Sequence, residues 1–202
     1  FKPAETGTFA VPSPKVMIVA SIHGNEKHPA LATYNMMYDV CKNWKQDERL
    51  RFLRHNVHFI IFPVLNTYGF DHSTRKNYNG VDLNRNFSHG WYLQAPTEIT
   101  YGGTAAFSEI ESQAVRDTVL ANPDLTLFVD FHNFAGTPTS LQYLWTMSPN
   151  SVLNRIASNF IRSMTSVWKK MEGVNQTDEV FGMSEVTGNI YGSSEQYVQL
   201  GL

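Results

Sequence analysis

Three short runs of apolar, β-branched and aromatic residues, separated by segments with helical periodicity, constrain the fold of this chain most strongly. The runs lie at residues 15–21, 56–64 and 125–131. Runs of this length and composition are typical of strands that are buried on both faces of a sheet. Helices are expected between the runs, at 29–44 and 109–121. Strands that alternate with helices predict an α/β fold in which helices cover both faces of the sheet.

Three further patterns complete the predicted organisation. Ser108 and Glu111 have the spacing of a capping box, which would begin the second of these helices. A stripe of apolar residues predicts a long helix over 150–171. No convincing element is visible over 66–106, and a loop of that length in a compact domain is often functional. The length of 202 residues suits a single domain, 1–202.

The composition argues against several classes of partner. The formal net charge of -2 gives no support for binding to nucleic acid or to an anionic membrane. The longest apolar runs are too short to span a bilayer.

A single cysteine, Cys41, excludes an intrachain disulfide and therefore a small disulfide-stapled scaffold. The chain begins with Phe1 and shows no signal peptide, so we expect a mature or excised form, with a secreted or periplasmic location favoured.

Side chains that can bind metals follow the ends of the predicted strands. His23 and Glu26 follow the first run, and Asp130 and His132 end the third. In open α/β sheets, binding sites gather just beyond the carboxyl ends of the strands. His23, Glu26 and His132 form a plausible ligand set for a catalytic zinc ion, with a fourth position left for water. A solvated turn, and a histidine hydrogen-bonded in the core, are the alternatives for these residues taken alone.

A polar block, STRKNYNGVDLNRNF, occupies residues 73–87 of the long loop. An arginine donates two parallel hydrogen bonds to a carboxylate, so Arg85 and the neighbouring Asn84 can form a carboxylate clamp. Arg75 can polarise a carbonyl group and stabilise an oxyanion. The alternative is a surface loop whose charges are solvated.

Five sequence blocks, in this order, resemble the zinc metallocarboxypeptidases, the carboxypeptidase A-like peptidases. The blocks are HGNE, PVLNTYGF, STRKNYNGVDLNRNF, YGGTAAFSEIESQAV and DFHN, and they cover about residues 16–134. The resemblance implies an α/β/α sandwich around a mixed parallel and antiparallel sheet. It also implies a zinc-dependent hydrolase in which a metal-activated water cleaves the C-terminal peptide bond.

The resemblance implies roles for individual residues. Arg75 would polarise the scissile carbonyl group, and Asn84 and Arg85 would bind the terminal carboxylate of the substrate. We therefore expect a substrate that is a peptide, or a small amide, with a free carboxylate. One zinc ion per chain would be bound by His23, Glu26 and His132.

The match is looser towards the C-terminal end. The segment YGSSEQY, residues 191–197, resembles the Gly-Ser segment that lines the family's specificity pocket, so Ser194 or Glu195 would face the side chain being released. The family's general base is a glutamate on a later strand, and no glutamate of this chain occupies the matching place. We expect a chain truncated at its C-terminal end rather than a naturally inactive form.

Two other hypotheses remain open at this point. HGNE and DFHN also resemble the aspartoacylase and succinylglutamate desuccinylase relatives, which cleave small N-acyl amino acids. An amidase of that kind, or a peptidase that acts on the peptide stems of bacterial cell walls, would share the zinc and the arginines. A catalytically inactive relative would bind peptides through the same clamp without turnover.

Overall fold

The computed structural model describes residues 13–133, 142–146 and 181–185, together with Ser194 and Val198. The chain falls into two compact units, one formed by residues 1–134 and 191–202 and the other by residues 135–190. In the second unit, β4 (Gln142–Thr146) pairs in parallel with β5 (Phe181–Glu185). The remaining described elements belong to the first unit, which carries the sequence blocks identified above.

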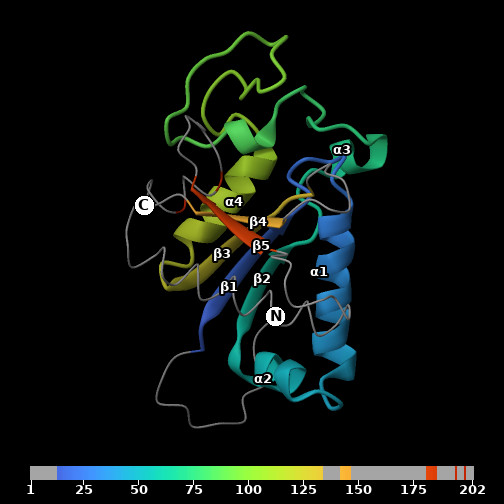
Figure 1. Ribbon diagram of the computed structural model, residues 1–202. Helices are drawn as coiled ribbons and strands as arrows, with labels where there is room; N and C mark the ends of the chain where they lie inside the picture. The colour runs from blue at the N-terminus through green and yellow to red at the C-terminus, as the bar shows by residue number, and fades with distance from the viewer. Residues whose placement is uncertain (1–12, 134–141, 147–180, 186–193, 195–197, 199–202) are drawn as a thin grey trace. The chain divides into compact units, whose positions relative to one another are not determined.

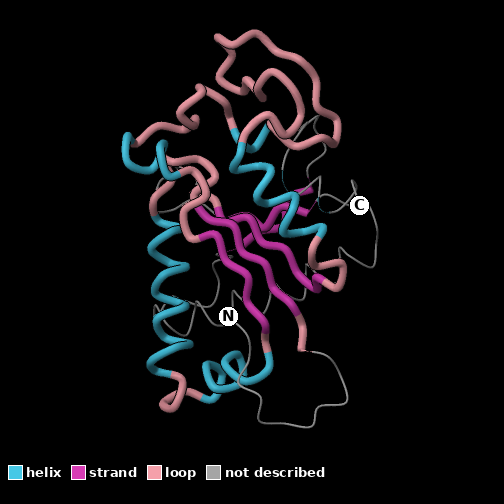
Figure 2. Tube along the Cα trace, turned by 180° about the vertical axis from the view of Figure 1, so that it is seen from behind, coloured by secondary structure: helices cyan, strands magenta, loops and turns pink. Residues whose placement is uncertain are grey.

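A parallel three-stranded sheet forms the centre of the first unit, with the strand order β2-β1-β3 (Figures 1 and 2). The strands are β1 (Lys15–Ala20), β2 (His58–Phe62) and β3 (Leu125–Phe131). In the register, Val19 lies opposite Phe62 on one side and Asp130 on the other. All three strands therefore end at the same edge of the sheet.

Alternate residues of β1 pack on opposite faces of the sheet, as the strand period of two requires. Met17 and Val19 join a buried cluster with Val115 and Val119 of α4 (Ile110–Leu120). Ile18 lies in a second cluster, against which Met36 and Leu53 also pack. These two residues come from α1 (His28–Tyr38) and α2 (Glu48–Asn56), so α1 and α4 cover opposite faces of the sheet (Figure 1).

The described structure confirms the α/β fold class and the three predicted strands of the first unit. The helix expected over 29–44 is present as α1, which is followed directly by a π-helical turn, η1 (Asp39–Asn43). All strand pairs among the described residues are parallel, and the predicted helix 150–171 lies outside those residues. No helix of the described ranges is both long and apolar enough to cross a membrane.

Two short helices had no signal in the apolar pattern. The helix α2 is charged and has no fully buried residue, and Asp47 caps it by accepting hydrogen bonds from the backbone N–H groups of Arg49 and Leu50. The helix α3 (Thr67–His72) is too short to show a period, and Asn66 caps it through the N–H of Gly69. Side-chain caps, rather than amphipathic stripes, therefore mark the beginnings of both helices.

The capping box predicted at Ser108 and Glu111 is wrong. The N-cap residue of α4 is Glu109, and its side chain makes no capping hydrogen bond. The hydroxyl of Ser108 donates to Glu109 Oε1 at 2.7 Å and lies 2.9 Å from Asn86 Nδ2. A loop side chain from a distant part of the chain therefore binds the hydroxyl that the local pattern assigned to the helix.

A buried network of amides and one carboxylate organises the long loop between β2 and α4. Asn86 is fully buried, and its Nδ2 donates to the carbonyl oxygens of Gly102 and Ala105. Its Oδ1 accepts hydrogen bonds from the Glu109 N–H and from the Ser112 hydroxyl. Because most backbone groups of the loop have no helix or strand partner, these side-chain bonds supply the partners that burial demands.

Glu109 is the second centre of this network. Its Oε2 accepts hydrogen bonds from Asn77 at 2.7 Å and from Asn79 at 2.8 Å. Burial alone would raise the pKa of this carboxyl group, but the hydrogen bonds from Asn77, Ser108 and Asn79 outweigh burial and hold the pKa below its ordinary value. Glu109 is thus ionised in the folded protein and stabilises the start of the polar block.

We predict that Asn86→Ala lowers the free energy of unfolding of the full-length protein by roughly 3 kcal/mol, because it leaves several buried donors and acceptors without partners. Urea unfolding followed by circular dichroism measures this loss. Asn43→Ala is the matched control. Within the described part of the chain, the Asn43 side chain makes one hydrogen bond, to Asp39, and its loss should cost about 1 kcal/mol or less. Equal losses in the two variants would contradict the role given to Asn86.

We predict that Glu109→Gln destabilises the protein near neutral pH and that the difference from wild type shrinks at acid pH. A carboxyl whose pKa is lowered on folding contributes stability above its unfolded pKa of about 4.5, and this stability is lost as the pH falls through the folded pKa. Urea unfolding across a pH series measures the difference. Glu98→Gln, at an exposed position, is the control. A gap between wild type and Glu109→Gln that stays constant down to pH 3 would refute the prediction.

Candidate metal and carboxylate-binding site

A tight turn after β1 brings His23 and Glu26 together at the edge where the three strands end. The backbone N–H of Glu26 donates to the carbonyl oxygen of His23 at 3.0 Å. Gly24 packs directly on the backbone of α3, and a Cβ atom at this position would lie 2.0 Å from the carbonyl carbon of Gly69. The HGNE turn therefore requires glycine at its second position for lack of space.

Asn66, the N-cap residue of α3, ties this turn to the polar block. Its side chain is fully buried and donates to the carbonyl oxygens of Ile22 and Arg75. Its backbone N–H donates to the carbonyl oxygen of Ser21. The asparagine of PVLNTYGF thus holds the segment before His23 against the segment that carries Arg75.

The carboxylate of Glu26 lies between two histidines that come from different strand ends. Its Oε1 lies 2.8 Å from Nδ1 of His23, and its Oε2 lies 3.0 Å from Nδ1 of His132. One potential ligand atom from each of the three residues lies within 4.8 Å of the others. The structure therefore brings together all three residues predicted as metal ligands, although 106 positions separate Glu26 from His132.

Each histidine directs its other ring nitrogen at an aspartate. Nε2 of His23 lies 3.3 Å from Oδ1 of Asp82, and Nε2 of His132 lies 3.2 Å from Oδ2 of Asp130. Both aspartate side chains are fully buried. A carboxylate on the far nitrogen fixes the tautomer and the orientation of a histidine that ligates metal through the near one. Asp130 and His132 are two residues apart, so they share one face of the chain, as the sequence indicated.

Electrostatics favours a cation at the centre of this cluster. Burial opposes ionisation of Glu26, but hydrogen bonds with His132 and His23 outweigh it and lower the pKa of this carboxyl group far below its ordinary value. Burial would lower the pKa of His23, but Asp82 and Glu26 raise it. Two imidazoles and one ionised carboxylate form a donor set that suits zinc. The donor atoms of His23, Glu26 and His132 therefore fit a zinc ion in number, chemistry and spacing.

Arg75 borders the cluster and is partly exposed. It donates from Nε to Asp82 Oδ2 at 2.9 Å, and its Nη1 lies 3.3 Å from Nδ1 of His23. Burial raises the pKa of Asp82, but His23, Arg75 and Arg85 together hold it below its ordinary value. One buried carboxylate thus positions both a predicted metal ligand and the predicted carbonyl-polarising arginine. Asp82 was not among the residues predicted for the site, although it is the only carboxylate in the polar block.

Asn84 and Arg85 lie beside the cluster on a single turn of 3-10 helix, η2 (Leu83–Arg85), which Asp82 caps through the N–H of Asn84. The side chain of Asn84 is nearly buried, and its Nδ2 lies 3.3 Å from Nε2 of His132. Arg85 donates to the carbonyl oxygen of Asn84 at 2.6 Å. The two residues predicted to clamp a carboxylate are therefore adjacent to the predicted metal ligands.

Ser194 is buried beside the same residues. Its backbone N–H donates to Asn84 Oδ1 at 2.9 Å, and its hydroxyl donates to Asp130 Oδ2 at 2.7 Å. Glu195, the other residue predicted to face the released side chain, lies outside the described residues.

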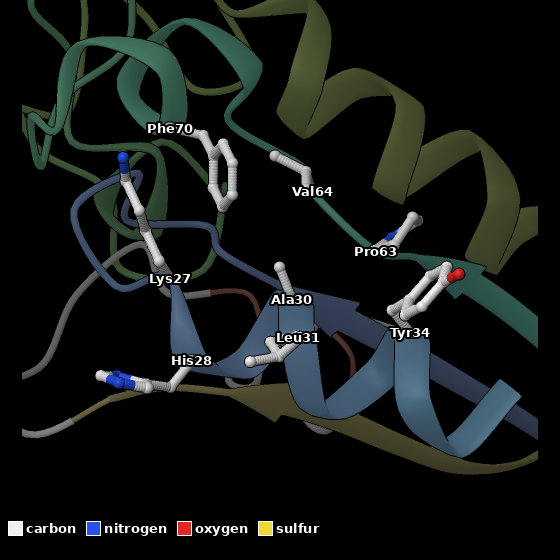
Figure 3. Close-up of a pocket in the computed structure, with 8 residues that line it drawn as sticks. All are labelled: Lys27, His28, Ala30, Leu31, Tyr34, Pro63, Val64 and Phe70. Carbon is white, nitrogen blue, oxygen red and sulfur yellow. The ribbon is translucent and has the colours of Figure 1, made fainter. Parts of the chain in front are cut away.

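A separate apolar hollow of about 490 Å³ lies beside α1 (Figure 3). Leu31 and Tyr34 line it from the helix, and Pro63, Val64 and Phe70 line it from the segment after β2. The residues assigned to metal or carboxylate binding are not among those that line it. His28, the first residue of α1, is exposed at this hollow.

Sequence comparison gives one family and several curated relatives. Residues 8–200 match the family described as zinc carboxypeptidase. Carboxypeptidase B2 of Mus musculus is 30% identical over 182 residues, which cover 76% of this chain and 42% of the relative. The zinc carboxypeptidase of Simulium vittatum is 27% identical over 142 residues, which cover 61% of this chain and 46% of that protein. The chain thus spans less than half the length of these curated relatives.

Comparison with solved structures shows that this chain has the fold of known carboxypeptidases. Thrombin activatable fibrinolysis inhibitor has a TM-score of 0.76 at 18% identity, with 95% of this chain and 52% of that chain covered. Carboxypeptidase A of Helicoverpa armigera has a TM-score of 0.69 at 24% identity, with 91% and 47% covered. Murein-tripeptide amidase MpaA of Escherichia coli O157 has a TM-score of 0.54 at 19% identity, with 95% and 72% covered.

The family match extends over nearly the whole chain, and the structural likeness agrees with the predicted carboxypeptidase-like sandwich. Within that span lie the strand ends, the histidine–glutamate–histidine cluster and the polar block with its two arginines. The chain belongs to the zinc carboxypeptidase family.

Proposed function

We propose that this chain forms the metal-binding and carboxylate-binding part of a zinc metallocarboxypeptidase with one zinc ion per chain. The observation that carries the proposal is the meeting of three potential ligands with Arg75, Asn84 and Arg85 at one edge of the sheet. A zinc ion bound by His23, Glu26 and His132 would supply a Lewis acid and lower the pKa of a water molecule.

The protein's own residues bind and orient the substrate in this proposal. Arg85 and the Nδ2 group of Asn84 receive the terminal carboxylate, because both offer N–H donors beside the cluster. Arg75, held by Asp82, donates to the oxygen of the scissile carbonyl group and stabilises the negative charge that develops there. Asp82 keeps the arginine and His23 in fixed relative positions. We assign the general base to no residue of the described part of the chain.

We predict that His132→Ala removes zinc from the purified full-length protein. Losing one of three protein ligands should weaken zinc binding by more than the 10–100-fold that is typical when a partner of a ligand is lost. Elemental analysis after dialysis, and titration against a chelator, measure the effect. His72→Ala is the control, because this histidine is exposed on α3 and bonds to the carbonyl oxygen of Tyr68. Wild-type zinc content in His132→Ala would refute the ligand assignment.

We predict different kinetic effects for the two arginines. With a blocked dipeptide that has a free carboxylate, Arg85→Ala should raise KM by about 10–100-fold. This is the loss of binding expected when a charge-assisted hydrogen bond is removed. Arg75→Ala should instead lower kcat, by about 100–1,000-fold, because its contact forms with the developing oxyanion. Steady-state kinetics of the full-length protein measure both parameters, and Arg49→Ala on the exposed face of α2 is the control.

A substrate panel separates the alternatives. N-acyl amino acids, cell-wall peptide stems and C-terminally free peptides all carry a carboxylate for the clamp, so the substrates that are turned over distinguish an amidase from a carboxypeptidase. Binding of peptides without turnover of any substrate would identify an inactive, peptide-binding relative. An unchanged KM in Arg85→Ala would contradict carboxylate binding by Arg85, whichever of the three functions the protein has: carboxypeptidase, amidase or inactive peptide-binding relative.

A further inference from the structure

Ser194 contacts two parts of the candidate site at once, although it is 110 positions from Asn84 and 64 from Asp130. Ser194 is fully buried. The backbone N–H binds the amide oxygen of Asn84, and the hydroxyl binds the carboxylate of Asp130. Neither group faces solvent, so both bonds are made in a setting where a lost partner is costly.

The backbone bond decides how the Asn84 amide is oriented. A backbone N–H can only donate, so the atom of Asn84 that faces Ser194 at 2.9 Å must be the oxygen. The amide nitrogen then lies 3.3 Å from Nε2 of His132, and the two groups make no hydrogen bond with each other when Nε2 carries the ring proton. Ser194 therefore turns the donor end of Asn84 towards the metal cluster.

The hydroxyl bond decides how the Asp130 carboxylate is held. Oδ2 receives the Ser194 hydroxyl at 2.7 Å and lies 3.2 Å from Nε2 of His132. Oδ1 is buried and has no hydrogen-bond partner within the described part of the chain. The same oxygen thus serves both contacts, and the hydroxyl is the contact that does not involve the predicted metal ligand.

We propose that Ser194 is a positioning residue that keeps Asp130 on the far nitrogen of His132 and so raises the zinc affinity of the site. This inference rests on the proposed function. When His132 offers Nδ1 to a metal, its neutral ring carries the proton on Nε2 and must donate it to an acceptor. Asp130 is that acceptor, and Ser194 restricts its carboxylate to the rotamer that reaches His132. The role differs from contact with the released side chain, which the sequence resemblance implied for Ser194.

The test measures zinc affinity of the full-length protein by competition with a chelator. Asp130→Asn should weaken zinc binding by about 10–100-fold, the usual effect of losing the partner of a metal-ligating histidine. Ser194→Ala should weaken it by about 3–10-fold, since Asp130 remains but loses its anchor. The double variant should be no weaker than Asp130→Asn within about twofold, because Ser194 acts through Asp130. Ser194→Cys, with a weaker donor of similar size, should fall between wild type and Ser194→Ala.

Ser112→Ala is the matched control. Ser112 is also fully buried, and its hydroxyl donates to Asn86 and to the carbonyl oxygen of Glu109, in the loop network. This variant should lower the urea midpoint of unfolding but leave zinc affinity at the wild-type value. If Ser194→Ala and Ser112→Ala have the same zinc affinity, the positioning role is overturned.

Two further outcomes separate this inference from the proposed function. Ser194→Ala keeps the backbone N–H that binds Asn84, so KM for a substrate with a free carboxylate should stay at the wild-type value. A raised KM with unchanged zinc affinity would overturn the positioning role and place the hydroxyl at the substrate, while the proposed function stands. A wild-type protein that binds no zinc would overturn both.

Discussion

Parallel pairing of β1 with β3 is the constraint on which the site depends. The register places Ala20 opposite Phe131, so the residues that follow each strand emerge side by side at one edge of the sheet. His23 and His132 can then share the carboxylate of Glu26. A shift of the register by one residue would turn Asp130 and His132 to the other face and separate the ligands.

Carboxylates surround the histidines in two layers. Glu26 lies between the two near nitrogens, and Asp82 and Asp130 lie on the two far nitrogens. Buried carboxylates are costly unless they are paired or bind a cation. The arrangement therefore favours a cation at its centre, and Arg75 neutralises the side of Asp82 that His23 leaves open.

Hydrogen bonds from polar side chains hold the long loop in place, as backbone hydrogen bonds do in helices and strands. Asn66 joins the turn after β1 to the segment before Arg75, and Asn86 and Glu109 join the rest of the block to α4. These side chains are buried and bonded to backbone groups or to each other, so hydrogen bonds define the path of the loop where regular elements are lacking. This explains how residues without regular secondary structure can carry a clamp of defined geometry.

The amino-acid sequence by itself predicted the three strands of the first unit, the helices α1 and α4, and the side chains that we propose to carry the chemistry. Apolar runs and their spacing report burial directly, and His23, Glu26, His132, Arg75, Asn84 and Arg85 stand in ordered blocks that resemble one family. The tertiary structure alone decided which partners those side chains have. The local pattern paired Ser108 with Glu111, but folding brings Asn86 to Ser108. Asp82 binds His23, and Ser194 binds Asp130, across 59 and 64 positions of the chain. Such contacts depend on the register of the sheet and the path of a long loop, which arise from packing over the whole unit and leave no periodic signal in the residues nearby.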